Sequence, residues 1–477
     1  MHSLVWFRND LRVTDNPALY QACSDSDRVS AVYIDCPHQW KLHGQSAVQR
    51  EFIAHNLEAL GRELSALGIS LNVFRCDSFA DVPALLDNWV RELDVAALYA
   101  NVDLGVNEYR RDRAVDARLN IPLHRFNGDC VVSHGSLRTG DGHMYRVFTP
   151  FSRAWIKHVI RDGYRLLPPP QTFEPLVTGT GDTETSQHHQ GSLETIWPAS
   201  EAAAQRRLTE FCRQHLMDYG ADRDFPDLDG TSGLSPYLAI GVLSPNQCLA
   251  AIEIELGQLP LSLGEAGFTW LNELIWREFY RHLLAAHPRL SMHCAFKPET
   301  DRIKWRHDEG LFQSWCQGKT GYPIVDAAMR CLNQTGWMHN RLRMITAGFL
   351  TKDLQIDWRL GEAYFMSRLI DGDLAANNGG WQWAAGTGAD AAPYFRIFNP
   401  TTQSQRFDRH GHFIKRWVPE LAEVPKQYIH TPHAWLSRQG LAQCYPAPVV
   451  DHALERRRAI EMFESIRRRN ASYTQSV

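Results

Sequence analysis

Three short stretches in the second half of the chain combine tryptophans with amide, acidic or basic side chains. They are residues 371–383 (DGDLAANNGGWQW), 270–280 and 336–344. Aromatic faces stack on planar ligands, and the amide and charged groups beside them can hydrogen-bond to those ligands. Buried tryptophans and solvated helix faces are the alternative for each stretch taken alone. Together the three stretches favour the walls of one aromatic, polar cavity.

The 371–383 stretch combines side chains that could bind a ligand with glycines that affect the backbone conformation. Residues 371–376 can end a helix, and Gly379-Gly380 then opens the backbone to the close approach of a ligand. Trp381 and Trp383 are two positions apart, so their rings face opposite ways on an extended chain or diverge on a helix.

The 270–280 stretch reads as a helix with one polar, aromatic face. Its members recur at i, i+3, i+4 and i+7, and they are Glu273, Trp276, Arg277 and Tyr280. A simple Glu273–Arg277 helix pair is the alternative. In 336–344, Asn340, Arg341 and Met344 share a face, whereas Arg343 points elsewhere, toward Asp371 or Asp373.

A hydroxyl-rich turn, residues 230–236 (GTSGLSP), leads into another helix. Backbone N–H groups and the hydroxyls of Thr231, Ser232 and Ser235 at a helix start can bind phosphate. An ordinary capped helix explains the same residues, so the turn alone does not decide between them.

Composition bounds the class of protein. The chain has 477 residues, 44% hydrophobic and 22% charged, with a net charge of −4, which is typical of a globular protein and not of a polycation. Residues 401–477 hold 12 Lys and Arg against 7 Asp and Glu, so an anionic polymer would meet a local basic face. A solvated, arginine-rich helix is the alternative for this tail.

The ten cysteines are scattered, with neither a C-x-x-C motif nor a metal-like Cys/His spacing, which argues against a zinc site and against a disulfide framework. We therefore expect no metal site, and we expect a reducing, cytoplasmic location. The N-terminal apolar run is too short for a signal peptide, and no run of about 18 apolar residues indicates a membrane span.

Strand and helix signals alternate in the first part of the chain. Five short apolar runs near residues 4, 29, 71, 95 and 123 are separated by amphipathic stretches, which predicts a doubly wound parallel sheet. Arg8-Asn-Asp-Leu-Arg12 follows the first strand in place of G-x-G-x-x-G, so an ordinary dinucleotide site is not expected there.

Beyond the sheet, the segments near 201–218, 245–256, 265–286, 323–335, 338–354 and 360–370 all scan as helices. We predict an α/β domain over 1–130, a long connector over 131–200 and an all-α domain over 201–477.

The chain resembles the photolyase/cryptochrome family over essentially its whole length. The resemblance rests on the 8–12 motif, the 230–232 turn, and residues 270–280, 320–330, 336–344, 371–383 and 395–400. It is greatest to the bacterial class I cyclobutane pyrimidine dimer photolyases. The resemblance implies an α/β antenna domain, a helical FAD-binding domain, and light-driven repair of damaged DNA by reduced FAD in a monomer.

The resemblance also assigns residues to FAD. The cofactor would be lined by Tyr219, Thr231, Ser232, Leu234, Ser235, Trp270, Arg277, Arg343, Asp371, Asp373 and Asn377. Asn377 would sit beside flavin N5, and Arg343 would face Asp371. Family members commonly place a basic or polar side chain where this chain has Gly233, which removes one phosphate contact.

Two further residue sets follow from the resemblance. Trp381, Trp358 and Trp305 match the family's electron-transfer tryptophans, although core packing is the alternative for the last two. The dimer, flipped out of DNA, would meet Glu273, Trp276, Asn340, Arg341, Met344, Trp383 and Arg396. Glu273 and Asn377 would be catalytic, and Glu273 would stabilise the radical anion of the dimer.

The antenna pigment would bind at Asn107 and Glu108, where folate-binding relatives hold the pterin. 5,10-methenyltetrahydrofolate is the expected pigment. The family's nearby Cys-Lys pair reads Ser291-Met292 here, so a deazaflavin or an empty site remains open.

Two other functions stay open at this point. One is a flavin photoreceptor of the cryptochrome type, which usually carries an extended regulatory tail. The other is repair of the (6-4) lesion, for which the subgroup places a histidine pair at the lesion; this chain has Met338-His339-Asn340 with Met344 there, as cyclobutane-dimer enzymes do.

Overall fold

The computed structural model describes residues 1–173 and 192–474. The chain divides into two compact units, which are described separately. Unit 1 comprises residues 1–217, 232–288 and 370–373, and unit 2 comprises residues 218–231, 289–369 and 374–477.

Unit 1 is built on a five-stranded parallel sheet with the strand order β3-β2-β1-β4-β5. The strands are β1 (His2–Phe7), β2 (Arg28–Asp35), β3 (Ser70–Arg75), β4 (Ala97–Asn101) and β5 (Leu123–Phe126). Leu4 of β1 lies beside Ser30 of β2 and Leu98 of β4. Because β1 is buried on both faces, it is a continuous apolar run. The predicted doubly wound sheet is confirmed.

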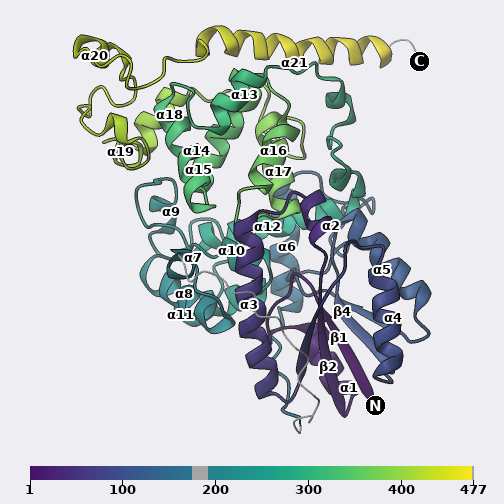
Figure 1. Cartoon of the computed structure of the whole chain (residues 1–477). Coiled ribbons are helices and arrows are strands. Elements are labelled where there is room, and N and C mark those ends of the chain that lie inside the picture. Colours follow the sequence, from purple (N-terminus) through teal and green to yellow (C-terminus); the bar gives the residue numbers. More distant parts are fainter. Residues whose placement is uncertain (174–191, 475–477) are drawn as a thin grey trace. The chain divides into compact units, whose positions relative to one another are not determined.

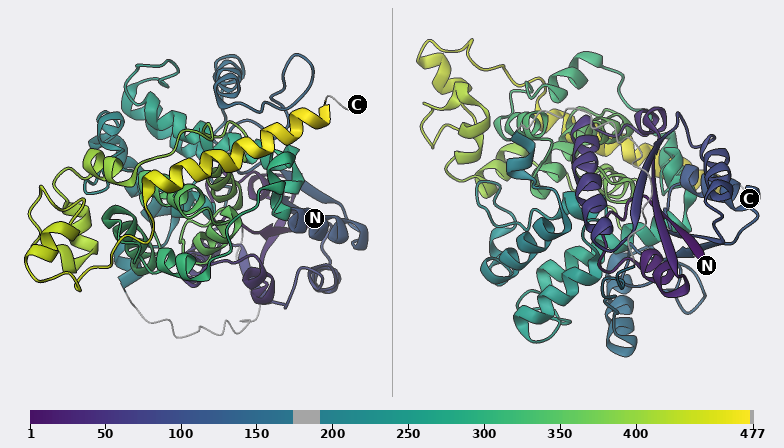
Figure 2. Two further views of the ribbon diagram at one scale, coloured as in Figure 1. Left: turned by 90° about the horizontal axis from the view of Figure 1, so that it is seen from above. Right: turned by 60° about the horizontal axis from the view of Figure 1, so that its bottom comes forward.

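Helices cover both faces of this sheet (Figures 1 and 2). They are α1 (Pro17–Asp25), α3 (Ala47–Ala66), α4 (Val82–Glu92) and α5 (Val106–Arg118), and the short α2 (Pro37–Leu42) follows β2 beyond the ends of the strands. Figure 1 shows α3 on one side of the strands and α4 with α5 on the other. Leu4, Trp6 and Ile34 of the sheet pack with Leu86 of α4 and Val115 of α5 in one apolar core.

The rest of unit 1 is helical. Its helices are α6 (Phe148–Asp162), α7 (Ser192–Ile196), α8 (Glu201–Gln214), α10 (Ser235–Ala239), α11 (Pro245–Leu256) and α12 (Phe268–Ala286). Helix α11 has clear local signals: Ser244 and Gln247 form a capping box, and Gly257 ends the helix in the left-handed region. Helices α6 and α7 lie within the range predicted as a connector, and residues 174–191 of that range lie outside the described residues. The boundaries at 130 and 200 stay predictions.

Unit 2 is helical in its described residues. Its helices are α9 (Tyr219–Asp222), α13 (Glu309–Cys316), α14 (Pro323–Thr335), α15 (Asn340–Gly348), α16 (Trp358–Met366), α17 (Leu374–Ala385), α18 (Pro400–Phe407), α19 (His412–Trp417), α20 (His433–Arg438) and α21 (His452–Thr474). Short 3-10 turns are η1 (Pro288–Met292), η2 (Pro298–Arg302) and η4 (Pro419–Leu421), and η3 (Phe349–Asp353) is a π-helical turn that continues α15.

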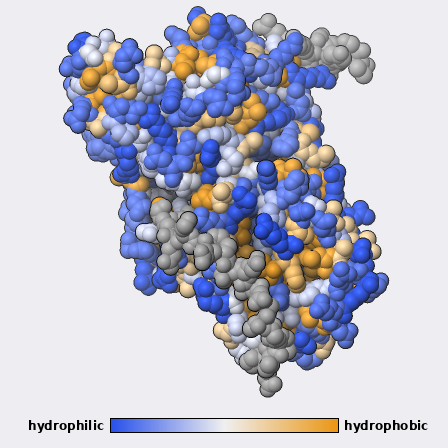
Figure 3. Space-filling model, viewed as in Figure 1, coloured by the Kyte–Doolittle hydropathy of each residue, from blue (hydrophilic) through white to orange (hydrophobic). Residues whose placement is uncertain are grey.

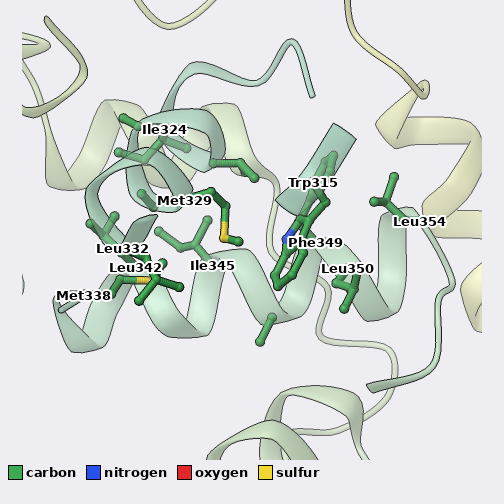
Figure 4. Packing of buried hydrophobic residues seen from close by; sticks show 14 of the residues in the cluster. Trp315, Ile324, Met329, Leu332, Met338, Leu342, Ile345, Phe349, Leu350 and Leu354 are labelled. Atoms are coloured by element: carbon green, nitrogen blue, oxygen red, sulfur yellow. The ribbon is translucent and has the colours of Figure 1, made fainter. Parts of the chain in front are cut away.

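The core of unit 2 lies between α13, α14, α15 and η3. Figure 4 shows Met329 and Ile345 together in this core, and Trp315 further along it with Phe349 and Leu350 of η3. Helix α21 runs as one long helix that contacts η2 and η3 (Figures 1 and 2).

One local prediction is wrong. Gly379 and Gly380 do not open the backbone, because both lie in the middle of α17. Trp381 and Trp383 therefore diverge on a helix: Trp381 is buried, whereas Trp383 is half-buried.

The surface in the view of Figure 3 is mostly hydrophilic, with apolar residues in separate patches. Among the described helices, none is both long and apolar enough to cross a membrane.

Candidate functional site

The residues predicted to bind FAD are divided between the two units. Unit 1 contains Ser232, Leu234, Ser235, Trp270, Arg277, Asp371 and Asp373, and unit 2 contains Tyr219, Thr231, Arg343 and Asn377. The predicted pairing of Arg343 with Asp371 joins residues of different units, so it stays a prediction.

Helix α12 presents the predicted polar, aromatic face. Glu273, Trp276, Arg277 and Tyr280 are all half-buried, whereas the opposite side of the helix is buried in the core. Trp276 stacks on Phe148, with ring centroids 3.6 Å apart and planes 7° apart. The Tyr280 ring lies on the same face, and its centroid is 5.7 Å from that of the Trp276 ring. The face is therefore a preformed aromatic surface and not a helix side exposed to solvent.

Trp270 lies one turn before this face and is buried. Its ring packs against Phe211 of α8, with centroids 4.9 Å apart. The structure thus places Trp270 at the base of the α12 face, inside the helical part of unit 1.

A charged network joins two of the predicted FAD residues, Arg277 and Asp373. Arg277 donates to the Asp129 carboxylate at 2.5 Å and to the backbone oxygens of Asp129 and Leu238. Arg281, one turn further along α12, forms ion pairs with both Asp129 and Asp373. Arg277 therefore has an ion-pair partner outside its own helix, Asp129, beyond the helix pair with Glu273 that was the alternative.

Asp129 lies at the centre of the network. Burial alone would raise its pKa, but the adjacent guanidinium groups of Arg277 and Arg281 hold the pKa of the Asp129 carboxyl well below its usual value. Sequence reasoning missed this residue, because 148 positions separate it from Arg277 and no local motif marks it.

The 230–236 turn leads into the short helix α10, whose N-cap residue, Leu234, makes no side-chain cap hydrogen bond. Ser232 Oγ accepts a hydrogen bond from the backbone N–H of Leu234, and α10 begins at Ser235. Gly233 adopts a positive φ of 57°, and a Cβ there would lie 2.7 Å from the Arg207 guanidinium. Arg207 also lies over the Trp197 ring, 4.6 Å from its centroid. The Arg207 guanidinium of α8 therefore occupies the space beside Gly233.

The start of α15 brings together residues predicted to contact the lesion. Arg341 and Met344 share a face, with Arg341 Nη1 3.8 Å from Met344 Sδ. Arg341 pairs with Asp224 at 2.6 Å and lies over the Phe407 ring. Asn340 is exposed at the first position of the helix. The predicted common face is confirmed for Arg341 and Met344.

His339 caps the same helix, because its Nδ1 accepts a hydrogen bond from the backbone N–H of Arg341. Burial lowers the pKa of His339 to about 4, so the imidazole is neutral at physiological pH. Arg343 points away from the Arg341–Met344 face and donates to the Met338 backbone oxygen at 2.7 Å.

The amides of α17 are held by α16. The Asn377 amide nitrogen donates to the Glu362 backbone oxygen at 3.0 Å, and Asn378 donates to the Glu362 carboxylate at 2.8 Å. Burial raises the pKa of Glu362 to about 7. Because a backbone carbonyl only accepts, the nitrogen end of Asn377 is fixed, and its oxygen is the end that can accept from a ligand N–H.

Three predicted electron-transfer tryptophans, Trp381, Trp358 and Trp305, belong to one buried apolar cluster of unit 2. Trp381 packs on Gly361 of α16, where no room remains for a Cβ. Trp315, which sequence reasoning did not select, lies in the same cluster with its ring 6.0 Å from that of Trp381. The shared burial agrees with core packing as well as with a relay.

The remaining predicted residues lie on the surface of unit 2. Tyr219 begins α9 beneath the Arg223 guanidinium, and Thr231 is half-buried. Trp383 is half-buried on α17, and Arg396 is exposed in the turn before α18.

The predicted antenna residues lie together in unit 1 around His43. Asn107 Nδ2 donates to His43 Nε2 at 3.0 Å, and Glu108 Oε1 lies 3.5 Å from His43 Nδ1. Since Nε2 accepts, the imidazole proton is on Nδ1 and faces Glu108. Trp40 and Phe79 pack edge-on against this ring.

A pocket adjoins this group at the carboxyl ends of β1, β2 and β4, and its empty volume is about 380 Å³ with its opening included. It is lined by residues that include Trp6, Arg8, Cys36, Asp103, Glu108 and Arg111. This is the crevice where the strand order reverses, the usual ligand position on such a sheet. Burial raises the pKa of Glu108 to about 7.

Comparison with known proteins gives consistent relatives. The family model for the FAD binding domain of DNA photolyase matches residues 270–465, and the model for DNA photolyase matches residues 3–172. The chain is 48% identical to the deoxyribodipyrimidine photo-lyases of Salmonella typhimurium and Escherichia coli, over 98% of this chain and 99% of each relative. The crystal structure of a class III photolyase from Agrobacterium tumefaciens matches with a TM-score of 0.86 and 34% identity, covering 98% of both chains.

Proposed function

Because this chain belongs to the DNA photolyase family, we propose that it is a deoxyribodipyrimidine photo-lyase, which splits cyclobutane pyrimidine dimers in DNA with light. Its 48% identity to two such enzymes extends over nearly the whole chain. The observation that carries the proposal is the α12 face, where Trp276 lies flat on Phe148 beside Glu273 and Arg277. This face combines an aromatic platform with acidic and basic groups.

The donor set fits FAD. Arg277 and Asp373 are held in place through Asp129 and Arg281, and such a network presents fixed charges to the polar parts of a dinucleotide. The Arg207 guanidinium, next to Gly233, offers the cation that the missing side chain at 233 does not. Asn377 holds its carbonyl oxygen toward an N–H such as that of flavin N5. When bound in its reduced form and excited by light, FAD supplies the electron that splits the dimer.

The lesion must leave the duplex to reach such a site, and photolyases are among the enzymes known to act on a nucleotide taken out of the stack. Trp276 and Trp383 provide aromatic surface for the dimer, and Met344 packs against it. Asn340 bonds the pyrimidine edge, and Glu273 bonds its carbonyl groups and stabilises the charge that develops there.

Arg341 and Arg396 hold the flanking phosphates. Arg341 is already paired with Asp224, so a phosphate shares or replaces that partner. The exposed Arg396 forms no ion pair with another described residue, so its guanidinium can meet a phosphate without such competition. Contacts of this kind make affinity fall with salt, whatever the base sequence.

The protonation state and hydrogen bond of His339 support the cyclobutane dimer, and not the (6-4) lesion, as the substrate. A histidine that acts as an acid on the lesion needs a proton to give, but His339 is buried, has a pKa near 4 and uses Nδ1 to cap α15. Met338, in the position before it, is fully buried in the core. This part of the site therefore lacks the acid that the alternative substrate would require.

We assign Trp381, Trp358 and Trp305 to a relay that carries electrons from the surface toward the FAD site. All three indoles belong to one apolar cluster, and the Arg359 guanidinium lies over the Trp358 ring, 4.7 Å from its centroid. We place the antenna pigment at Asn107 and Glu108, with 5,10-methenyltetrahydrofolate as the expected pigment and a deazaflavin as the alternative. We also infer a cytoplasmic location, since the ten cysteines are all free, and a monomer from the similarity to the bacterial photo-lyases.

Binding in the dark tests the proposal. The purified protein should bind a duplex that contains a thymine dimer more tightly than the matched undamaged duplex, and blue light should release it after flavin reduction. Fluorescence anisotropy follows both steps. Equal affinity for the two duplexes, or a damaged complex that light leaves unchanged, would favour the photoreceptor function.

A further inference from the structure

A buried group of metal-ligand side chains lies behind α12, away from its aromatic face. Glu278 and His282 are one turn apart on α12, and Cys130 lies in the loop that follows β5. The Cys130 sulfur, a Glu278 carboxylate oxygen and a His282 ring nitrogen all lie within 4.8 Å of one another. All three residues belong to unit 1, and each is less than 5% exposed.

A fourth candidate ligand, His134, lies beside these three residues. His134 Nε2 lies 3.1 Å from the Cys130 sulfur, and the rings of His134 and His282 are 5.5 Å apart. The four residues form the spacings C-x-x-x-H and E-x-x-x-H in segments far apart in sequence. The prediction of no metal site rested on the absence of a C-x-x-C motif and of a metal-like Cys/His spacing, whereas these four side chains come as two pairs from distant segments.

Part of this group already has a structural role. The Glu278 carboxylate accepts hydrogen bonds from the backbone N–H groups of Val131 and Val132, and His282 Nε2 donates to the Val132 oxygen. These bonds hold the 130–132 loop on α12. They involve neither the Cys130 sulfur nor His282 Nδ1, which is buried without a hydrogen-bond partner in the described part of the chain.

The hydrogen bond of His282 resembles the second shell of a metal site. Metal-binding imidazoles commonly donate one ring N–H to a backbone carbonyl, which orients the ring and leaves the other nitrogen with its lone pair for the ion. Val132 provides that carbonyl. The unpartnered Nδ1 is costly in a buried site unless a positive group meets its lone pair. Because Nε2 is the ring nitrogen 3.7 Å from the Glu278 carboxylate, the imidazole has to turn for Nδ1 to face the ion.

The charges also favour an ion. A divalent cation that replaces the thiol proton would meet one thiolate and one carboxylate, so the buried group would have no net charge. Thiolate with imidazole ligands is the set that Zn²⁺ prefers.

We propose that Cys130, His134, Glu278 and His282 bind one structural Zn²⁺ ion that clamps the loop after β5 onto α12. Zinc bonds of about 2.0–2.3 Å place tetrahedral ligand atoms roughly 3.4–3.8 Å apart. The Cys130, Glu278 and His282 ligand atoms, which lie within 4.8 Å of one another, therefore draw together by up to about 1 Å on binding, whereas His134 Nε2, 3.1 Å from the sulfur, moves slightly away from it. The ion replaces the thiol proton of Cys130, and this proton is released to solvent.

The position gives the ion a consequence for the site. Asp129, which pairs with Arg277 and Arg281, directly precedes Cys130. An ion that fixes Cys130 on α12 therefore also fixes the carboxylate that orients Arg277. This consequence depends on the proposed function, whereas the metal itself does not.

Metal analysis of the whole protein tests the proposal. Protein purified from zinc-supplemented medium should contain about one Zn per chain by mass spectrometry, and X-ray absorption at the zinc edge should show one sulfur among about four ligands. FAD does not interfere with either measurement. Cys130→Ala and His282→Ala should each reduce the zinc content to a small fraction of that of the wild type.

The control is Cys248→Ala, a fully buried cysteine of unit 1 outside this group. It should retain the zinc content and should show the thermal stability expected for the loss of one buried sulfur. His134→Ala should retain less zinc than the control, and X-ray absorption should then show one nitrogen fewer.

Three results would overturn the proposal. They are no zinc in the wild type even after titration of the folded apoprotein, zinc that persists in Cys130→Ala, or zinc without sulfur in its coordination shell. Undiminished zinc in His134→Ala would remove that residue from the ligand set. A zinc-containing protein without photolyase activity would contradict the proposed function but not the metal site.

Discussion

The indole of Trp276 lies flat on the phenyl ring of Phe148, with centroids 3.6 Å apart and planes 7° apart. One face of the tryptophan is therefore already covered, so a ligand can stack only on its other face. Phe148 begins α6, and it also packs edge-on against Phe279 in the core. The stacking platform for the lesion is thus anchored in the interior of unit 1.

Trp276→Ala should weaken binding of the dimer-containing duplex about 5- to 150-fold, because aromatic stacking contributes about 1–3 kcal/mol per base. Affinity for undamaged duplex should change little, since phosphate contacts from other residues dominate it. Phe148→Leu should give a smaller loss, as it removes only the support of the indole. Equal losses on damaged and undamaged duplex in anisotropy titrations would show that Trp276 does not stack on the lesion.

Asp129→Asn should destabilise the protein by about 2 kcal/mol, because it leaves the buried Arg281 short of a partner. The value is below the roughly 3–5 kcal/mol of a fully buried pair, since the Asp129 side chain is 28% exposed. FAD retention should fall as well, because Arg277 loses its orienting carboxylate. Urea unfolding and flavin fluorescence after dialysis measure the two effects.

The same variant predicts a pH dependence. Because the folded-state pKa of Asp129 lies below that of an unfolded aspartate, about 3.9, the pairing stabilises the fold above about pH 4 and loses this contribution as pH falls further. The difference in unfolding free energy between wild type and Asp129→Asn should therefore be constant from pH 5 to 7 and shrink below about pH 4. A difference that grows on acidification would contradict the ion-pair explanation.

Trp381→Phe should abolish light-driven reduction of the flavin in the presence of an external reductant. Repair by enzyme that was reduced beforehand should remain nearly intact, because the relay is then not needed. Trp315→Phe is the matched control, since that ring lies in the same cluster 6.0 Å from Trp381. If both variants are reduced by light at the wild-type rate, the electron follows another route.

Glu108→Gln should weaken retention of the antenna pigment, because a carboxylate binds the amino group of a pterin better than a neutral amide does. Burial raises the pKa of Glu108 to about 7, so in the wild type pigment retention should increase from pH 6 to pH 8 as the carboxyl ionises. Glu108→Gln should remove this pH dependence. Absorption spectra after gel filtration, with folate and with deazaflavin as separate ligands, give the readout and distinguish the two pigments.

Local signals predicted the elements well because the decisive residues lie close together in sequence. The apolar run of β1 and the amphipathic helices around it define a doubly wound sheet, and Pro323 with Gly336 marks both ends of α14. The prediction that Gly379 and Gly380 open the backbone was wrong, because the amides of Asn377 and Asn378 bind Glu362 and hold α17 helical through both glycines.

The candidate site was predictable only where its residues share an element. The α12 face follows from helical spacing. In contrast, Phe148 and Asp129 meet this face from distant segments, and Arg207 meets Gly233 from another helix, so only the fold brings these partners together. Likewise, no local pattern in the sequence joins Cys130 to His282. Long-range partners of this kind depend on how the loop after β5 packs on α12, which periodicity does not encode.

The most direct test compares two lesions in one assay. The reduced enzyme is mixed with oligonucleotides that contain either a cyclobutane thymine dimer or a (6-4) photoproduct, and each mixture is exposed to blue light or kept dark before chromatography of the products. We predict that the cyclobutane dimer is restored to thymines only in the light, and that Glu273→Ala lowers the yield per absorbed photon more than it lowers affinity. The (6-4) lesion should remain unchanged. Restoration of the (6-4) lesion alone, or of neither lesion, would contradict the account.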